Sequence, residues 1–125
     1  MFTNIATVAI YVDRQEEAQE FWTKKVGFKT IREDQMNPHQ FWIEVAPSLE
    51  SKTRLLIYSR EMMLEDNPDA ICHPSIVFDC EQIDGLRQKL KDNGVSVGPV
   101  QNMHYGKFFE LQDNEGNSYL VREQK

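Results

Sequence analysis

The feature that most constrains this fold is an internal repeat, in which the order strand, helix, strand, strand, strand is read twice along 125 residues. The separation between matching positions of the two copies shortens slowly along the chain, as loops of different length would make it do. The matched pairs are Val8 with Ile76, Gly27 with Gly94, Glu44 with Glu110, and Leu56 with Leu120. The sequence therefore predicts an α+β fold built from two βαβββ modules.

The first copy opens with the alternating, β-rich segment 7–12, which predicts a strand. Asp13 and Glu16 then have the spacing of a capping box at a helix start. Apolar residues recur at helical spacing as far as Val26, and Gly27 stands where a left-handed helix cap is expected. Three further strands are predicted over residues 28–33, 41–45 and 54–58.

The second copy repeats this order from the predicted strand 75–80 onward. A helix face follows with Ile83, Leu86 and Leu90, and Gly94 ends that helix. The polar segment 113–117 is rich in residues that favour a tight turn. The remaining strands are predicted over residues 95–97, 107–111 and 119–122.

The whole chain, residues 1–125, is interpreted as a single domain containing both modules. Residues 1–59 form the first module, residues 60–73 a linker, and residues 74–125 the second module. A module of about 60 residues buries little apolar surface by itself. The two modules should therefore share an interface or exchange halves between the subunits of a homodimer.

Composition argues against several classes of function. The net charge of −6 and the isoelectric point near 5.0 lack the basic footprint of a nucleic-acid-binding protein. No apolar run approaches the ~18 to 20 residues that span a bilayer, and no basic patch suits a membrane surface. Two cysteines, Cys72 and Cys80, are too few for a disulfide framework. We expect a cytoplasmic protein without nucleic-acid or membrane partners.

Two segments resemble a known family. "VAIYVDRQEEAQEFWTKKVGF" is similar to the opening strand and helix of the vicinal oxygen chelate superfamily, which includes glyoxalase I, bleomycin-resistance proteins and extradiol dioxygenases. "FFELQDNEGNSYLV" is similar to the closing segment of the same family, with Asn114 in place of its usual proline. The resemblance covers nearly the whole chain. It implies the glyoxalase/bleomycin-resistance fold, in which paired modules form a cup-shaped mixed sheet.

In metal-using members of the family, four strand positions around the cup supply His, Glu or Gln ligands to a divalent ion. Aligned by register, these positions fall on Thr7, Leu56, Ser75 and Leu120. Leucine cannot coordinate a cation, and a neutral hydroxyl is a poor ligand. We therefore predict no metal ligand and no cofactor.

Strand alternation separates two faces in each module. One face is continuously apolar and should pack under the helices. The other mixes aromatic, acidic and basic side chains, as small-molecule sites often do. The predicted ligand-binding residues lie on this mixed face or at its rim: Thr7, Tyr11, Trp42, Glu44, Arg54, Tyr58, Ser75, Asp79, His104, Phe108, Glu110 and Arg122.

Other interpretations of these residues remain open. The aromatic side chains could simply fill the cup or be covered by a partner subunit. The arginines, Arg54 and Arg122, could form a structural network with Glu44, Asp79 or Glu110.

The leading hypothesis is a metal-free small-molecule-binding protein of the bleomycin-resistance type, which sequesters a drug or metabolite and has no catalytic residue. One alternative is a metal-dependent glyoxalase-, lyase- or dioxygenase-like enzyme whose metal site lies elsewhere. The other is a non-catalytic dimeric interaction module.

Overall fold

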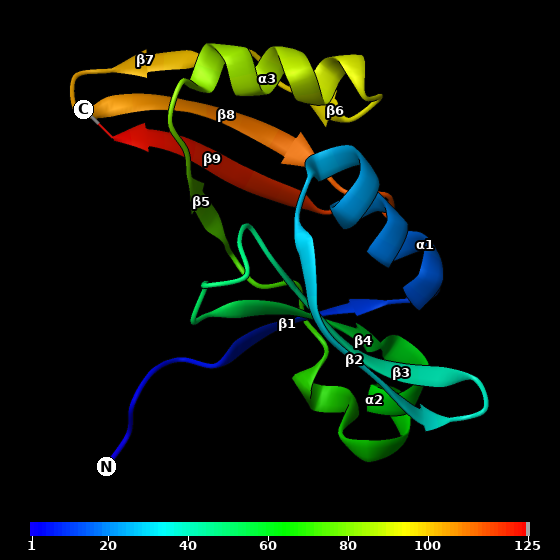
Figure 1. The fold of residues 1–125 in the computed structure, drawn as a ribbon. Helices are drawn as coiled ribbons and strands as arrows, with labels where there is room; N and C mark the ends of the chain where they lie inside the picture. The colour runs from blue at the N-terminus through cyan, green and yellow to red at the C-terminus, as the bar shows by residue number, and fades with distance from the viewer. Residues whose placement is uncertain (125) are drawn as a thin grey trace. The chain divides into compact units, whose positions relative to one another are not determined.

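A computed structural model describes residues 1–124, and the chain divides into two compact units (Figure 1). Unit 1 is Met1–Pro74, and unit 2 begins at Ser75. Each unit has its own sheet and at least one helix, so the fold is α+β.

Unit 1 contains a four-stranded sheet with the strand order β1-β4-β3-β2. β1 and β4 are parallel, whereas the other two pairings are antiparallel. Its elements are β1 (Thr7–Val12), α1 (Gln15–Glu20), the π-helix η1 (Phe21–Val26), β2 (Lys29–Asn37), β3 (Gln40–Ala46), β4 (Arg54–Ser59), α2 (Arg60–Asp66) and the 3₁₀-helix η2 (Pro68–Ala70).

The helical segment of unit 1 forms because three apolar residues, Ala18, Phe21 and Trp22, become buried together. The segment ends at Gly27, whose φ of 96° is the left-handed conformation that the sequence predicted there. Beyond Glu20 the hydrogen bonding changes from α to π, which apolar spacing alone does not signal.

The predicted capping box at the start of α1 is wrong. Arg14 occupies the N-cap position, and no side chain caps the helix. Asp13 instead forms an ion pair with Arg60 at the start of α2. A charge 47 residues away in the chain thus outcompetes the local helix end for this carboxylate.

The interval predicted as a linker contains two short helices, α2 and η2. α2 starts directly after β4 because Ser59 is its N-cap and accepts a hydrogen bond from the Met62 amide at 3.2 Å. A serine that precedes a helix is a start signal visible in the sequence, so α2 was predictable from Ser59.

Unit 2 repeats the strand order of unit 1, with its first strand beside its last and its third strand next to that. This arrangement confirms the repeat. The elements are β5 (Val77–Asp79), α3 (Ile83–Asp92), β6 (Ser96–Val97), β7 (Gln101–Met103), β8 (Gly106–Gln112) and β9 (Ser118–Gln124).

Two strands of unit 2 differ from the prediction. β5 covers only part of the predicted strand 75–80. The second strand of the module is split into β6 and β7, which both pair with β8. Gly98 and Pro99 lie in the gap, and proline has no amide hydrogen to donate to a strand ladder.

The core of unit 2 lies between its sheet and α3, which lies over the strands (Figure 1). Ile83 and Leu90 of α3 are buried, as are Phe109 and Leu111 of β8. The alternate residues of β8 and β9 are more exposed, and they form the opposite face of the sheet.

The turn between β8 and β9 is organised by the buried carboxylate of Asp113. It accepts hydrogen bonds from the Glu115 amide at 2.9 Å, the Asn117 amide at 3.0 Å and the Tyr119 hydroxyl at 2.6 Å.

Among the described residues, no helix is long and apolar enough to cross a membrane.

Candidate functional site

The strand register of unit 1 places the predicted site residues of this unit on one sheet face. Along β1 and β4, Thr7 pairs with Arg54 and Tyr11 pairs with Tyr58. Glu44 of β3 lies opposite Leu56 of β4, so it shares their parity. We call this surface the aromatic face; it comprises Thr7, Tyr11, Trp42, Glu44, Arg54 and Tyr58.

Three aromatic rings form a row across this face. Tyr58 lies between Tyr11 and Trp42, with ring centroids 6.2 Å and 5.9 Å away and edge-on ring planes. Burial raises the pKa of the Tyr58 hydroxyl, and the nearby Asp66 carboxylate adds to this effect. Tyr58 is therefore a neutral hydroxyl at physiological pH, and the partly exposed rings of Tyr11 and Trp42 lie on either side of it.

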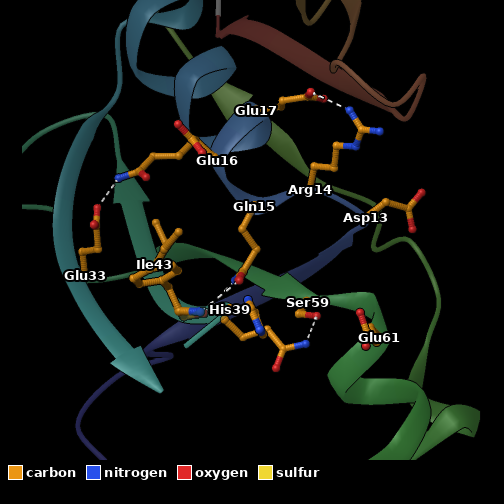
Figure 2. Close-up of a pocket in the computed structure, with 13 residues that line it drawn as sticks. Asp13, Arg14, Gln15, Glu16, Glu17, Glu33, His39, Ile43, Ser59 and Glu61 are labelled. Carbon is orange, nitrogen blue, oxygen red and sulfur yellow. Dashed lines mark hydrogen bonds and ion pairs between the residues drawn. The ribbon is translucent and has the colours of Figure 1, made fainter. Parts of the chain in front are cut away.

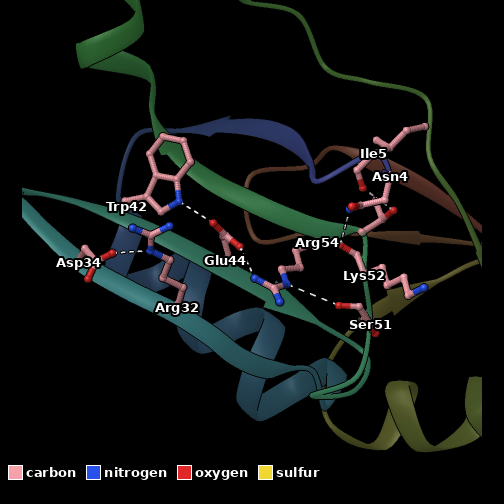
Figure 3. Close-up of polar contacts among 10 residues, drawn as sticks. Asn4, Ile5, Arg32, Asp34, Trp42, Glu44, Ser51, Lys52 and Arg54 are labelled. Atoms are coloured by element: carbon pink, nitrogen blue, oxygen red, sulfur yellow. Dashed lines mark hydrogen bonds and ion pairs between the residues drawn. The ribbon is translucent and has the colours of Figure 1, made fainter. Parts of the chain in front are cut away.

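Glu44 is the charged residue at the centre of the aromatic face, and only 5% of it is exposed. The Trp42 indole nitrogen donates to its Oε2 at 2.7 Å, and Arg54 Nη1 donates to its Oε1 at 3.0 Å (Figure 3). Both oxygens therefore have a hydrogen-bond donor, and these bonds offset the free-energy cost of removing the carboxylate from water. The pairing of Arg54 with Glu44 is the structural network that the sequence left open.

The second half of the predicted site lies on unit 2. Asp79, Arg122 and Phe108 lie side by side on β5, β9 and β8. Arg122 Nε donates to Asp79 at 2.7 Å, and this hydrogen bond lowers the pKa of Asp79 and raises that of Arg122. Glu110 is not part of that pair; its Oε1 accepts from the Ser118 hydroxyl at 3.2 Å.

A cavity of about 240 Å³ opens on this face of unit 2. Two of the predicted site residues, Phe108 and Glu110, line it. The other lining residues are Gly98, Pro99, Gln101, Phe109 and Leu120. The cavity joins an aromatic ring, an aliphatic side chain and one carboxylate.

The other four predicted residues of unit 2 do not line this cavity: the paired Asp79 and Arg122, and also His104 and Ser75. His104 is exposed in the turn between β7 and β8, with its ring edge-on to Tyr105 at 4.8 Å. Tyr105 in turn contacts Phe108, at a centroid distance of 5.7 Å. Ser75 is exposed and precedes β5.

The positions that hold a metal in the family's metal-using members do not fit one here. Leu56 of β4 pairs with Ala9, and Leu120 of β9 pairs with Val77, so the strand positions at issue are flanked by aliphatic side chains. Within residues 1–124, no three His, Cys, Asp or Glu side chains are grouped to hold a metal ion. The donor chemistry of Thr7 and Ser75 is too weak to compensate.

A larger cavity, about 540 Å³, lies on the helix side of unit 1 (Figure 2). No predicted site residue lines it. Gln15 of α1 lines this cavity. Its side-chain amide donates hydrogen bonds to the carbonyl oxygens of Phe41 at 2.6 Å and Ile57 at 2.9 Å, which fixes the side chain against β3 and β4. The wall residues include Asp13, Arg14, Glu16, Glu17, Gln19, Glu33, His39, Gln40, Ile43, Ser59 and Glu61.

Sequence reasoning missed this cavity because its residues come from a helix start, a hairpin end and the interval after β4. No periodicity or motif links these segments. Their side chains are largely paired with one another, as Arg14 is with Glu17 and Gln19 with Glu33.

Comparison with known proteins first defines the class. Among solved structures, an antibiotic-binding protein, TnmS3 from Streptomyces sp. CB03234, matches with a TM-score of 0.82 and 22% identity over 99% of this chain and 98% of that one. A glyoxalase/bleomycin resistance protein/dioxygenase superfamily member from Sphaerobacter thermophilus DSM 20745 matches with a TM-score of 0.83 and 20% identity, covering 98% of each chain. These similarities show that the fold is the glyoxalase/bleomycin-resistance fold.

The sequence then gives the family. The model of the Glyoxalase/Bleomycin resistance protein/Dioxygenase superfamily matches residues 4–119. The uncharacterized protein YetH of Bacillus subtilis (strain 168) is 42% identical over 124 residues, which cover 98% of this chain and 100% of that protein. The chain belongs to the Glyoxalase/Bleomycin resistance protein/Dioxygenase superfamily.

Proposed function

We propose that this chain is a metal-free small-molecule-binding protein that sequesters a drug or metabolite without altering it. The observation that carries the proposal is the aromatic face of unit 1. There the central carboxylate, Glu44, accepts hydrogen bonds from Trp42 and Arg54, so both of its oxygens already have partners. The partly exposed rings of Tyr11 and Trp42 provide apolar area for binding.

The metal positions support binding over metal-assisted chemistry. Thr7, Leu56, Ser75 and Leu120 are two hydroxyls and two aliphatic side chains, a donor set that does not suit a divalent ion. Because TnmS3, which has the same fold, is an antibiotic-binding protein, a drug-like organic molecule is the ligand class to test here.

The test is tryptophan fluorescence during titration with a panel of drugs and metabolites. Trp42 lies on the aromatic face, whereas Trp22 is fully buried against Phe21 and Phe28. A Trp42→Phe variant should lose most of the ligand-induced change, and a Trp22→Phe variant should keep it. Ligand recovered after long incubation should be chemically unchanged.

Two results would contradict the proposal. If the fluorescence change follows Trp22, or if both variants respond alike, the aromatic face is not the binding surface. If incubation converts the ligand into a product, the protein is an enzyme and the sequestering function is wrong.

We also infer that the protein is a homodimer. A module of about 60 residues buries little apolar surface by itself, so pairing with a second copy of the chain would add burial. Val77 of β5, which is not among the residues that line the 240 Å³ cavity, is 49% exposed. Light scattering after size exclusion should give twice the chain mass, and a Val77→Glu variant should dissociate. A monomeric wild-type protein would contradict this inference.

A further inference from the structure

The charged residues on the predicted binding faces are not all in the same state. Arg54 neutralises Glu44 in unit 1, and Arg122 neutralises Asp79 in unit 2. Glu110 differs, because within residues 1–124 its carboxylate has a serine hydroxyl as its hydrogen-bond donor and forms no ion pair.

The cations nearest to Glu110 in the sheet are engaged elsewhere. Arg122 belongs to β9 next to Phe108, and its guanidinium binds Asp79. Lys107 precedes Phe108 on β8, but its ammonium lies 3.2 Å from Asp84 of α3. Glu110 therefore carries an uncompensated negative charge on the wall of the 240 Å³ cavity.

We propose that this cavity receives a protonated amine carried on an apolar group, with the ammonium against Glu110 and the apolar group against Phe108 and Leu120. The inference rests on the proposed binding function and names the class of ligand that this cavity of unit 2 takes.

Desolvation is the physical reason for this selectivity. A molecule that fills the cavity removes water from the Glu110 carboxylate, and burying an unpaired charge is costly. An ammonium group offsets that cost with a charge-assisted hydrogen bond, whereas an alcohol offsets only part of it. A ligand carboxylate would add repulsion between like charges.

The rest of the wall suits the same molecule. Phe108 offers an aromatic ring, which binds both apolar groups and cations. The carboxamide of Gln101 adds a neutral polar group at the wall. The cavity is smaller than the ~300 to 1,000 Å³ of a whole drug-sized site, so it accommodates a single ring with its amine.

The experiment compares three probes that each carry a phenyl ring and a polar group on a two-carbon chain: 2-phenylethylamine, 2-phenylethanol and 3-phenylpropanoate. Their dissociation constants are measured by NMR titration, following amide signals of β8 and β9. We expect the amine to bind at least tenfold more tightly than the alcohol and the propanoate to bind most weakly. The preference should decrease as salt is added, since the carboxylate is solvent-accessible.

Two variants that remove a charge with almost no change in shape test whether the Glu110 carboxylate causes the preference for the amine. Glu110→Gln should abolish the preference for the amine while leaving binding of 2-phenylethanol unchanged. Glu81→Gln is the matched control, since it removes an exposed carboxylate of the same unit that lies outside the cavity lining, and it should keep the preference. Phe108→Ala should weaken all three probes.

The proposal is overturned if the alcohol binds as tightly as the amine, if the preference survives in Glu110→Gln, or if none of the probes binds at millimolar concentration. Its failure is distinguishable from failure of the binding function. A ligand that quenches Trp42 without any charge preference would leave the binding function intact and remove only the amine.

Discussion

Replacing Asp113 with alanine should be the most damaging polar substitution in unit 2. Its carboxylate accepts four hydrogen bonds within the β8–β9 turn: from the amides of Glu115 and Asn117, the Asn117 side chain and the Tyr119 hydroxyl. The Tyr119 side chain is only 2% exposed, so water cannot readily replace the lost acceptor.

The expected loss of stability follows from these contacts. Removing the acceptor of a buried hydroxyl costs about 1 to 3 kcal/mol. The turn amides are more accessible and can bind water, so together they add about 2 kcal/mol. Asp113→Ala should therefore lower the free energy of unfolding by about 3 to 5 kcal/mol, a large part of the ~5 to 15 kcal/mol typical of a domain.

Urea denaturation followed by circular dichroism measures this loss, and a double-mutant cycle isolates the buried bond. Tyr119→Phe removes the hydroxyl alone and should cost about 1 to 2 kcal/mol. Once Tyr119 is phenylalanine, Asp113→Ala should cost about 1 to 2 kcal/mol less than in the wild type. A cost below about 1 kcal/mol for Asp113→Ala, or a coupling energy near zero, would refute the reasoning.

Three further predictions concern local geometry and charge. Gly27→Ala should destabilise the fold by about 1 kcal/mol because Gly27 is left-handed, whereas Gly85→Ala inside α3 should stabilise it by about 0.5 to 1 kcal/mol. Neither new Cβ meets an atom within 4 Å, so the difference comes from the backbone conformation. Urea denaturation that gave both variants a change of the same sign in the free energy of unfolding would contradict this. Gln15→Ala should cost about 2 kcal/mol by thermal denaturation, since three backbone groups lose a partner, and a loss below 0.5 kcal/mol would contradict it. The pKa of Asp79 is lowered by its pairing with Arg122, so this pair stabilises the fold above the ordinary carboxylate pKa and stops doing so as the pH falls through the folded pKa. Because both groups are solvent-exposed, Asp79→Asn should change the midpoint of acid unfolding little. A large shift of that midpoint would contradict the exposed assignment.

The burial of Tyr119 also predicts behaviour at alkaline pH. Burial and the hydrogen bond to Asp113 raise the pKa of this phenol above its ordinary value, so the folded state favours the neutral form. Its contribution to stability is complete below the unfolded pKa of about 10 and is lost as the pH rises beyond it. Denaturation measured from neutral to strongly alkaline pH should show this decline, and Tyr119→Phe should flatten it. An unchanged slope in the variant would contradict the assignment.

Several features of the fold could be read from the sequence because they depend on local patterns. The alternation of β1 and β4 placed Tyr11 and Tyr58 on one face, and the register has them paired. Gly27 was recognised as a left-handed helix end because few other residues tolerate that conformation. The repeat itself was visible because each module needs the same order of apolar segments.

Other features depended on which segments meet in space. Asp13 has the spacing of a helix cap, yet it pairs with Arg60, because an ion pair across the unit is available to it. The hydrophobic pattern of 18–26 gave no sign that the helix becomes a π-helix at Phe21. Local sequence indicates which nearby backbone groups a side chain could bind. It does not determine which residue from a distant part of the chain comes into contact with that side chain.

The candidate site shows the same division. The sequence by itself determined which side chains share the mixed face, because strand alternation is a property of the backbone. Only the tertiary structure decided that Arg54 pairs with Glu44 and Arg122 with Asp79, leaving Glu110 with a serine hydroxyl. The physical reason is that the attraction between two charges weakens with the distance between them. Strand pairing sets that distance, because it brings together residues that are far apart in the chain.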